Sequence, residues 1–280
     1  MNVVVIGTGN MALECVKYIH KSFPNDTLAV ALTRKNVENK VLADFCQKES
    51  LDVIEVDDFH SGDLYDFIER YKTDWIFNIN SMILYPDSLL QTPKNGVVNF
   101  HNGPLPFYKG LNVCSWAIVN GETRYGVTWH YIKKGEPIDS GKIIHQELFE
   151  IKENETALSL IIKCVDVGLE CFPKVYRKVS DGYEGTPQAG EGSIYFSKQK
   201  PNNGFIDLTW PYSKIKNFMN GLKFSPFPNL FVTPKIDLNG STYEVTSVSL
   251  LQNDRTEQNL LDNERILKCV DSTLLFKLKK

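Results

Sequence analysis

Residues 3–12, VVVIGTGNMA, decide the class of fold that this sequence encodes. Val3 to Ile6 form a continuous apolar run, which is typical of a strand buried on both faces of a parallel sheet. Gly7-Thr8-Gly9 ends this run, and apolar residues then recur at helical spacing from Met11 onwards. The stretch predicts a strand, a tight turn and a helix, which together begin an α/β fold.

The alternation of strands and helices continues outward from this stretch. Apolar runs predict further strands at residues 28–32, 51–56, 75–79 and 97–101, with helices between the first three. Beyond a loop rich in Gly and Pro, two more strands are predicted at residues 126–131 and 143–149. A long helix is predicted over residues 155–178, with an apolar stripe of Leu158, Ile161, Ile162, Val165, Leu169, Phe172 and Tyr176. This order predicts a doubly wound, mostly parallel, Rossmann-like sheet.

The composition changes near residue 180, which indicates a domain boundary. Residues 180–192 are rich in Gly, Ser, Pro and acidic side chains and are interpreted as a linker. Short β-rich segments follow, with turns such as Asn239-Gly240 between them. We therefore expect a larger α/β domain over residues 1–180 and a small β-rich domain over residues 193–280.

Composition narrows the functional class. The 280 residues include 31 basic and 34 acidic side chains, with a pI near 6.0, so no strongly basic surface is indicated and a nucleic-acid partner is not expected. The chain runs directly into a strand without a basic leader, and no apolar run approaches the roughly 20 residues that span a bilayer. We expect a cytoplasmic protein without a membrane partner.

Cysteines and histidines are scattered along the chain. None of the six cysteines forms a pair at the two-residue spacing of zinc or redox motifs, and His20, His60 and His145 form no cluster in the sequence. The sequence therefore predicts reduced core thiols and no metal.

The glycine motif at residues 7–12 matches the dinucleotide fingerprint G-x-G-x-x-G/A. The acidic residue that binds ribose in that fingerprint is missing, because the second strand ends in Thr33-Arg34-Lys35. Arg34 or Lys35 could contact the extra phosphate of NADP, although solvated basic side chains are commoner. An NADP-dependent oxidoreductase, a different phosphate site and a purely structural turn all stay open.

The segment from residue 98 to residue 141, VNFHNGPLPFYKGLNVCSWAIVNGETRYGVTWHYIKKGEPIDSG, carries the clearest chemistry. Asn99 and His101 are two residues apart near a strand end, so both point to one face, and open α/β sheets bind ligands beyond the carboxyl ends of their strands. Asp139 lies in a later turn that can return to the histidine. Taken alone, Asn99 is more simply explained as the end of a strand, His101 as a buried histidine whose hydrogen bonds are satisfied, and Asp139 as a turn residue. Taken together, the three residues indicate a catalytic site.

This segment resembles the core of the folate-dependent formyltransferases. The shared pattern is Asn-x-His, a Pro-Leu-Pro loop ending in Tyr-x-Gly, then Gly-Val-Thr-x-His and Asp-Ser-Gly. The family includes glycinamide ribonucleotide, methionyl-tRNA, sugar and peptide-synthetase formyltransferases. The likeness runs from the first strand to about residue 170, with a weaker echo at residues 192–210 that is similar to the connection into the family's small β domain.

The resemblance implies a formyl transfer from 10-formyltetrahydrofolate to an amine. It implies catalytic roles for Asn99, His101 and Asp139, and a folate pocket formed by Met82, Ile83, Leu84, Ile138 and Asp139. Residues 1–180 would then be the formyltransferase catalytic domain, and no metal is required.

Differences between this sequence and the family pattern narrow the choice of the acceptor amine. The interval from His130 to Asp139 is about two residues longer than in most relatives, and residues 33–39 replace a longer loop that meets tRNA in the methionyl-tRNA enzymes. The segment NFHNGPLP is most similar to the corresponding sequence of sugar and peptide-synthetase formyltransferases. A nucleotide-linked amino sugar is therefore our first expectation, with a carrier-bound amine or methionyl-tRNA as alternatives; a homodimer and a non-catalytic folate- or nucleotide-binding protein also stay open.

Overall fold

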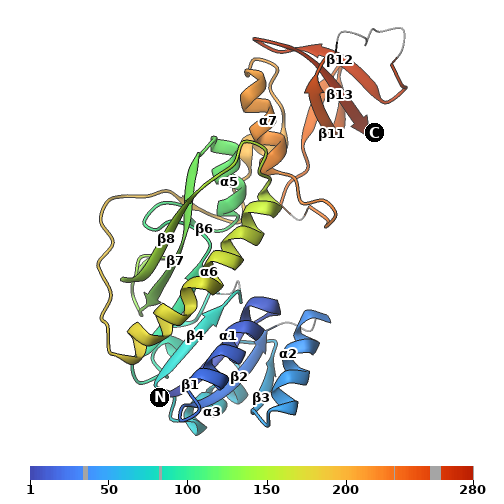
Figure 1. Ribbon diagram of the computed structural model, residues 1–280. Helices are drawn as coiled ribbons and strands as arrows, with labels where there is room; N and C mark the ends of the chain where they lie inside the picture. Colours follow the sequence, from blue (N-terminus) through green and yellow to red (C-terminus); the bar gives the residue numbers. More distant parts are fainter. Residues whose placement is uncertain (34–36, 82–83, 230, 253–259, 280) are drawn as a thin grey trace. The chain divides into compact units, whose positions relative to one another are not determined.

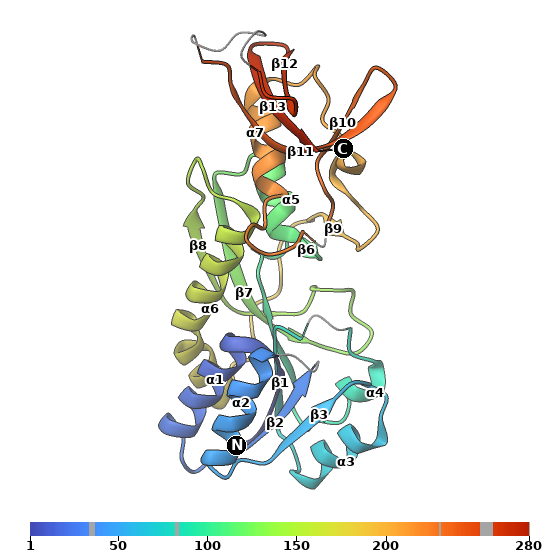
Figure 2. The ribbon, with the colours of Figure 1, turned by 90° about the vertical axis from the view of Figure 1, so that its right-hand side faces the viewer.

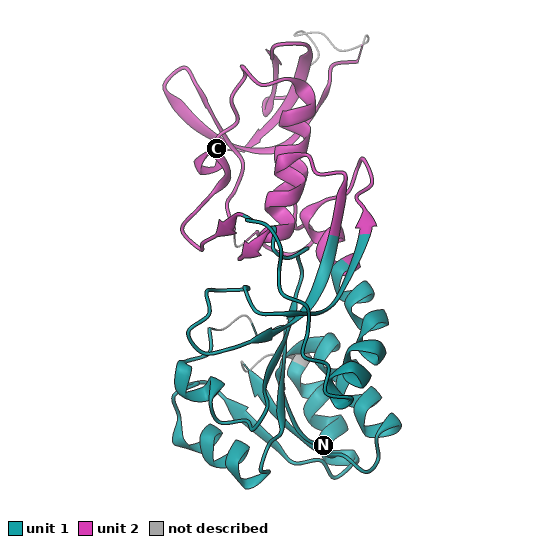
Figure 3. Ribbon diagram, turned by 90° about the vertical axis from the view of Figure 1, so that its left-hand side faces the viewer, with its two compact units in different colours: residues 1–107, 126–148, 164–192 teal, residues 108–125, 149–163, 193–280 magenta. Residues whose placement is uncertain are grey.

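The computed structural model describes residues 1–33, 37–81, 84–229, 231–252 and 260–279. Contacts divide these residues into two compact units, shown in Figure 3. Unit 1 comprises residues 1–107, 126–148 and 164–192, and unit 2 comprises residues 108–125, 149–163 and 193–280. The expected domain boundaries near residues 180 and 193 stay a prediction.

A seven-stranded sheet dominates unit 1, in the order β3-β2-β1-β4-β5-β7-β8 (Figure 1). The strands are β1 (Asn2–Gly7), β2 (Thr27–Thr33), β3 (Val53–Val56), β4 (Trp75–Ile79), β5 (Gly96–His101), β7 (Arg124–Ile132) and β8 (Ile143–Glu150). Neighbouring strands are parallel from β3 through β2, β1 and β4 to β5, whereas β5 and β7 are antiparallel. The predicted mostly parallel, doubly wound sheet is confirmed.

Helices cover both faces of this sheet (Figure 2). They are α1 (Gly9–Ser22), α2 (Val37–Lys48), α3 (Gly62–Arg70), α4 (Asp87–Leu90) and α6 (Ala157–Ser180). Val3 and Val5 pack into one core with α1, α2 and α6, while Val4 and Ile6 pack into a second core with α3. The two cores explain why β1 is apolar at every position, since alternate side chains of a strand enter opposite faces.

The buried stripe of α6 differs from the predicted one. Its buried side chains include Ala157, Leu160, Cys164, Cys171, Phe172, Val175, Tyr176 and Val179. Ile162, which was expected in the stripe, is 51% exposed. Phe172 and Tyr176 are buried as predicted, but the prediction omitted the small buried residues Ala157, Cys164 and Cys171.

Unit 2 contains a four-stranded antiparallel sheet in the order β10-β11-β13-β12. The strands of this sheet are β10 (Lys235–Leu238), β11 (Ser241–Leu250), β12 (Glu264–Lys268) and β13 (Thr273–Lys279). The other elements of the unit are β6 (Lys109–Gly110), α5 (Val113–Asn120), β9 (Ile194–Tyr195), a 3₁₀ turn at Pro201–Gly204 and α7 (Tyr212–Gly221). The predicted turn at Asn239-Gly240 joins β10 to β11, and both residues have positive φ, as a tight hairpin requires. The small C-terminal β sheet is confirmed, and α7 packs into its core.

No helix among these described residues is long and apolar enough to span a bilayer.

Candidate active site

Sheet register places three polar side chains in a row across unit 1. Asn99 of β5 pairs with Asn78 of β4 on one side and with His130 of β7 on the other. Paired residues point to the same face of a sheet, so the three side chains adjoin. Asn78 Nδ2 donates to Asn99 Oδ1 at 2.7 Å, and Asn99 Nδ2 lies 3.0 Å from His130 Nε2. All three residues are buried, so these hydrogen bonds hold each amide in a fixed orientation.

The contacts at the two ends of this row determine which atom donates in each of its hydrogen bonds. His130 Nδ1 lies 2.9 Å from the carbonyl oxygen of Tyr131, which can only accept, so Nδ1 carries the hydrogen. In a neutral ring Nε2 then accepts from Asn99. At the other end, the Tyr85 hydroxyl donates to Asn78 Oδ1 at 3.0 Å. Tyr85, Asn78, Asn99 and His130 thus form one hydrogen-bonded row, which we call the amide row.

Asp139 lies between two imidazole rings. Its Oδ2 is 3.5 Å from His101 Nδ1, and its Oδ1 is 3.5 Å from His130 Nε2. His101 follows Asn99 by two residues on the same face of β5, as predicted. The structure therefore brings Asn99, His101 and Asp139 together. Both 3.5 Å separations exceed an ordinary hydrogen bond, and His130 Nε2 in the tautomer assigned above carries no hydrogen to donate to Asp139.

The turn that carries Asp139 is fixed by a residue far along the chain. Gln188 Nε2 donates to the backbone oxygens of Asp139 and Gly141, each at 2.8 Å. Gly141 is also closely packed, since an added Cβ would lie 1.8 Å from the oxygen of Tyr131. Residues 180–192, interpreted as a linker, thus contribute to the site, and Thr186 forms a β-bridge with Ile143.

A cavity of about 170 Å³ opens beside the amide row. Three of the residues predicted to bind folate line it: Leu84, Ile138 and Asp139. Leu84 is 73% exposed and Ile138 is 37% exposed, so both offer apolar surface to a ligand. Met82 and Ile83, the other two predicted residues, lie outside the described residues. The longer turn at residues 133–137 also contributes to the wall of this cavity.

The turn of the glycine motif is hydrogen-bonded to the side chain of Asn39. Asn39 Oδ1 accepts from the Gly9 amide at 3.2 Å and from the Thr8 hydroxyl at 2.7 Å. Gly7 is required because an added Cβ would lie 2.5 Å from the oxygen of Ile79. The structural reading of the turn is favoured, because Asn39 holds the amide that a phosphate would need. Arg34 and Lys35, the alternative phosphate ligands, lie outside the described residues.

Several members of the site were not foreseen, among them Asn78, Tyr85 and Gln188. Asn78 carried a signal, since an amide within the apolar strand residues 75–79 needs a buried partner. Gln188 carried none, because nothing local to a polar segment indicates which distant carbonyl it meets. His130 contacts both Asn99 and Asp139.

A Rossmann-like sheet with Asn, His and Asp at the carboxyl end of a central strand is the arrangement that the resemblance predicts for formyltransferases. The sequence profile of the formyl transferase family matches residues 1–176. The GDP-perosamine N-formyltransferase of Brucella melitensis is 31% identical over 249 residues, which make up 89% of this chain and 93% of that protein. The chain therefore belongs to the formyltransferase family and is a transferase.

Other relatives agree with this assignment. The methionyl-tRNA formyltransferase of Fusobacterium nucleatum is 25% identical over 265 residues, covering 92% of this chain and 82% of that protein. The crystal structure of an N-formyltransferase from Helicobacter canadensis with folinic acid and dTDP-3-aminofucose shares the fold, with a TM-score of 0.73, 21% identity and 99% of each chain covered. The oxidoreductase hypothesis, which depended on the glycine motif, loses its support.

Proposed function

We propose that this enzyme transfers the formyl group of 10-formyltetrahydrofolate to a primary amine on a nucleotide-linked amino sugar. Family membership supports the formyl transfer. The named activity of the Brucella relative and the ligands of the Helicobacter structure support the sugar and the folate. The observation that carries the proposal is the meeting of Asn99, His101 and Asp139 at the end of β5.

The proposed reaction begins with attack of the neutral amine on the formyl carbon. A nitrogen–carbon bond forms, the carbonyl π electrons move to oxygen, and a tetrahedral intermediate results. In the amide row, one hydrogen of Asn99 Nδ2 is directed to His130, and we assign the other to the developing oxyanion. A protonated His101 donates to the same oxygen, and the Asp139 carboxylate beside it stabilises the imidazolium.

Collapse of the intermediate completes the transfer. The attacking nitrogen carries an excess proton, which Asp139 accepts directly or through water. The carbonyl re-forms, the bond to N10 of the folate breaks, and N10 leaves as an amine after it receives the proton that Asp139 accepted. The products are the formamide and tetrahydrofolate, and no covalent enzyme intermediate is involved.

The cavity beside the amide row suits the reacting end of a folate. Leu84 and Ile138 would contact the apolar faces of the pterin, and the Asp139 turn would meet its polar edge. The resemblance implies that Met82 and Ile83 also line the folate pocket, and this stays a prediction. These assignments concern binding of the co-substrate, while Asn99 and His101 are reserved for the formyl oxygen.

An amino sugar is preferred over tRNA for two reasons. The net charge of −3 offers little attraction to a polyanion, and the Brucella sugar enzyme matches more closely over its length than the Fusobacterium tRNA enzyme does. A carrier-bound amine stays the next alternative. A cytoplasmic location and a homodimer stay predictions.

The test is an acceptor panel with 10-formyltetrahydrofolate, which contains GDP-perosamine, a dTDP-linked 3-amino sugar, methionyl-tRNA and an aminoacylated carrier protein. Mass spectrometry would detect the gain of one carbonyl unit on the acceptor. We expect formylation of at least one nucleotide-linked sugar with a kcat/KM far above that for the tRNA. Formylation of methionyl-tRNA alone would overturn the sugar assignment but keep the formyl transfer.

A further inference from the structure

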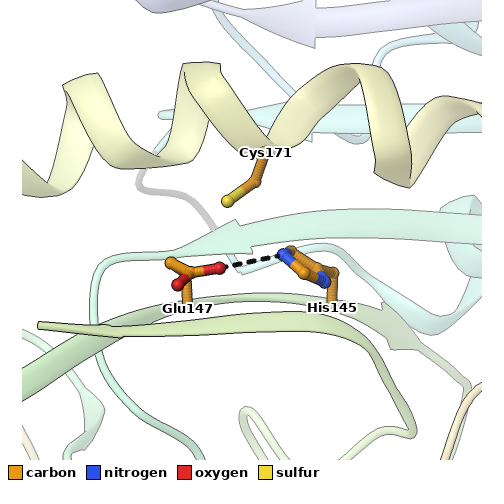
Figure 4. A group of neighbouring side chains, drawn as sticks. All are labelled: His145, Glu147 and Cys171. Carbon is orange, nitrogen blue, oxygen red and sulfur yellow. Dashed lines mark ion pairs between the residues drawn. The ribbon is translucent and has the colours of Figure 1, made fainter.

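A second group of reactive side chains lies in unit 1 away from the amide row. It consists of His145 and Glu147 of β8 and Cys171 of α6, and it is drawn in Figure 4. One ligand atom from each residue lies within 4.8 Å of the other two. In Figure 4 the two β8 side chains point toward the helix and the thiol points back toward the strand.

Alternation along β8 separates this group from the proposed catalytic site. His145 and Glu147 are two residues apart and share one face of the strand. Gln146 between them faces the other way, where its Nε2 donates to the Leu105 carbonyl and to the Thr128 hydroxyl. Thr128 pairs with His101 in the sheet. The group therefore lies on the face of β8 opposite the one that supports the active site.

The group contains a buried nitrogen whose hydrogen-bonding capacity is not met. His145 Nε2 is buried and has no hydrogen-bond partner among the described residues. Glu147 Oε2 forms an ion pair with it at 3.5 Å, a distance that is long for a hydrogen bond. Cys171 is a free cysteine, 5% exposed, on the other side of this space. An imidazole nitrogen, a carboxylate and a thiol thus lie within 4.8 Å of one another.

We propose that His145, Glu147 and Cys171 form a site for a divalent transition-metal ion of the zinc class. Zinc binds nitrogen at about 2.0–2.1 Å and sulfur at about 2.3 Å in a tetrahedral site, which places those two ligand atoms about 3.6 Å apart. The ligand atoms now lie within 4.8 Å of one another, so binding requires them to approach by up to about 1 Å. On binding, the thiol releases its proton to solvent, and water completes the fourth position on the side where Glu147 is exposed.

The ligand set selects the kind of metal. Thiolate and imidazole favour zinc-class ions, whereas calcium and magnesium need several oxygen ligands and would find one carboxylate here. The surrounding charges are mixed: Glu147 and Glu170 are acidic, and Lys174 and Lys178 are basic. An ion held by charge alone gains little from such surroundings, so directional bonds to nitrogen and sulfur have to hold it. The bound ion would link β8 to α6.

The test uses Co²⁺ as a spectroscopic probe of the full chain after chelation and reduction. We expect one equivalent to produce a thiolate-to-cobalt charge-transfer band and tetrahedral visible bands, and Zn²⁺ to abolish both. Cys171→Ser should remove the charge-transfer band. Cys164→Ser should keep it, and it is the matched control because Cys164 is also buried on α6, two turns earlier. His145→Gln and Glu147→Gln each remove one proposed ligand. Loss of a group that only supports a metal ligand weakens metal binding by roughly 10- to 100-fold, so we expect each variant to weaken Co²⁺ binding by at least that factor.

Thermal unfolding gives a second measurement that does not depend on activity. Zn²⁺ should raise the Tm of the wild type and of Cys164→Ser and leave that of Cys171→Ser unchanged. If Cys171→Ser does not fold, the two β8 variants decide the question. Absence of the charge-transfer band in the wild type, or its survival in Cys171→Ser, would overturn the proposal.

Discussion

Asn99 Nδ2 lies 3.0 Å from His130 Nε2, and this contact couples the proposed oxyanion donor to the protonation state of a buried histidine. With His130 neutral, Nε2 accepts and the amide row runs in one direction from Tyr85 to the Tyr131 carbonyl. A proton on Nε2 would place two donors against each other, so Asn99 would have to turn and present its oxygen instead. We therefore propose that His130 positions the amide of Asn99.

Removing the amide of Asn78 tests the amide row. Asn78→Leu keeps a similar volume but leaves Asn99 Oδ1 without its 2.7 Å donor and the Tyr85 hydroxyl without its acceptor. We expect a loss of about 1–3 kcal/mol in the free energy of unfolding, because buried polar groups become unpaired. With Asn99 less well oriented, kcat should fall by up to about 100-fold. Steady-state kinetics with both substrates varied should show a smaller change in KM, and equal changes in kcat and KM would argue against a positioning role.

Gln188→Leu tests whether the supposed linker supports Asp139. The substitution removes two 2.8 Å hydrogen bonds to the Asp139 turn and touches no proposed substrate-binding side chain. We expect kcat to fall about 10-fold or more as the carboxylate loses its fixed place beside His101. Gln252→Leu, at an exposed position, is the control and should keep wild-type kinetics. Wild-type kcat in Gln188→Leu would show that the turn holds its shape without this side chain.

Gly141→Ala tests the close packing of the same turn. The added Cβ would lie 1.8 Å from the Tyr131 oxygen, so the backbone has to move. Overpacking of this kind costs about 1–3 kcal/mol, and the movement should also lower kcat. Gly62→Ala is the matched control, because its Cβ meets nothing within 4 Å and its φ is not positive. That variant should gain about 0.4–1 kcal/mol in urea denaturation. Equal stability of the two variants would contradict the packing described here.

The core thiol Cys46 predicts how stability depends on alkaline pH. Burial raises the pKa of Cys46 from 9.0 to about 11. A raised pKa in the folded state means that the folded protein keeps a proton which the unfolded chain loses. Its contribution to stability is complete below pH 9 and is lost as the pH rises to about 11. The free energy of unfolding should fall less between pH 8 and pH 10 in Cys46→Ala than in the wild type, and an identical fall would contradict the shift.

Local patterns were enough to predict most of the fold. The apolar run of β1, the Asn239-Gly240 turn and the placement of Asn99 and His101 on one face all follow from short-range periodicity. The stripe of α6 could not be located in the same way, because small residues such as Ala157 and Cys164 form much of its buried face. Burial of small side chains depends on how closely another element approaches, and that is set by the tertiary structure.

The site was predictable where one strand contains its residues and unpredictable where distant segments meet. Asn99 and His101 are neighbours on β5, and the family pattern added Asp139. Asn78 becomes adjacent through the register of β4 against β5, and Gln188 through the path of a polar segment. Cys171 approaches β8 only because α6 packs there, so the spacing of cysteines and histidines indicated no metal.

The proposed mechanism is tested most directly by the effect of Asp139→Asn on formyl transfer to the best acceptor of the panel. The variant keeps the size of the side chain but removes the charge beside His101 and the acceptor for the amine proton. We predict a fall in kcat of at least about 100-fold. Wild-type kcat in Asp139→Asn would show that the chemistry takes place without this carboxylate, and the proposed mechanism would be wrong.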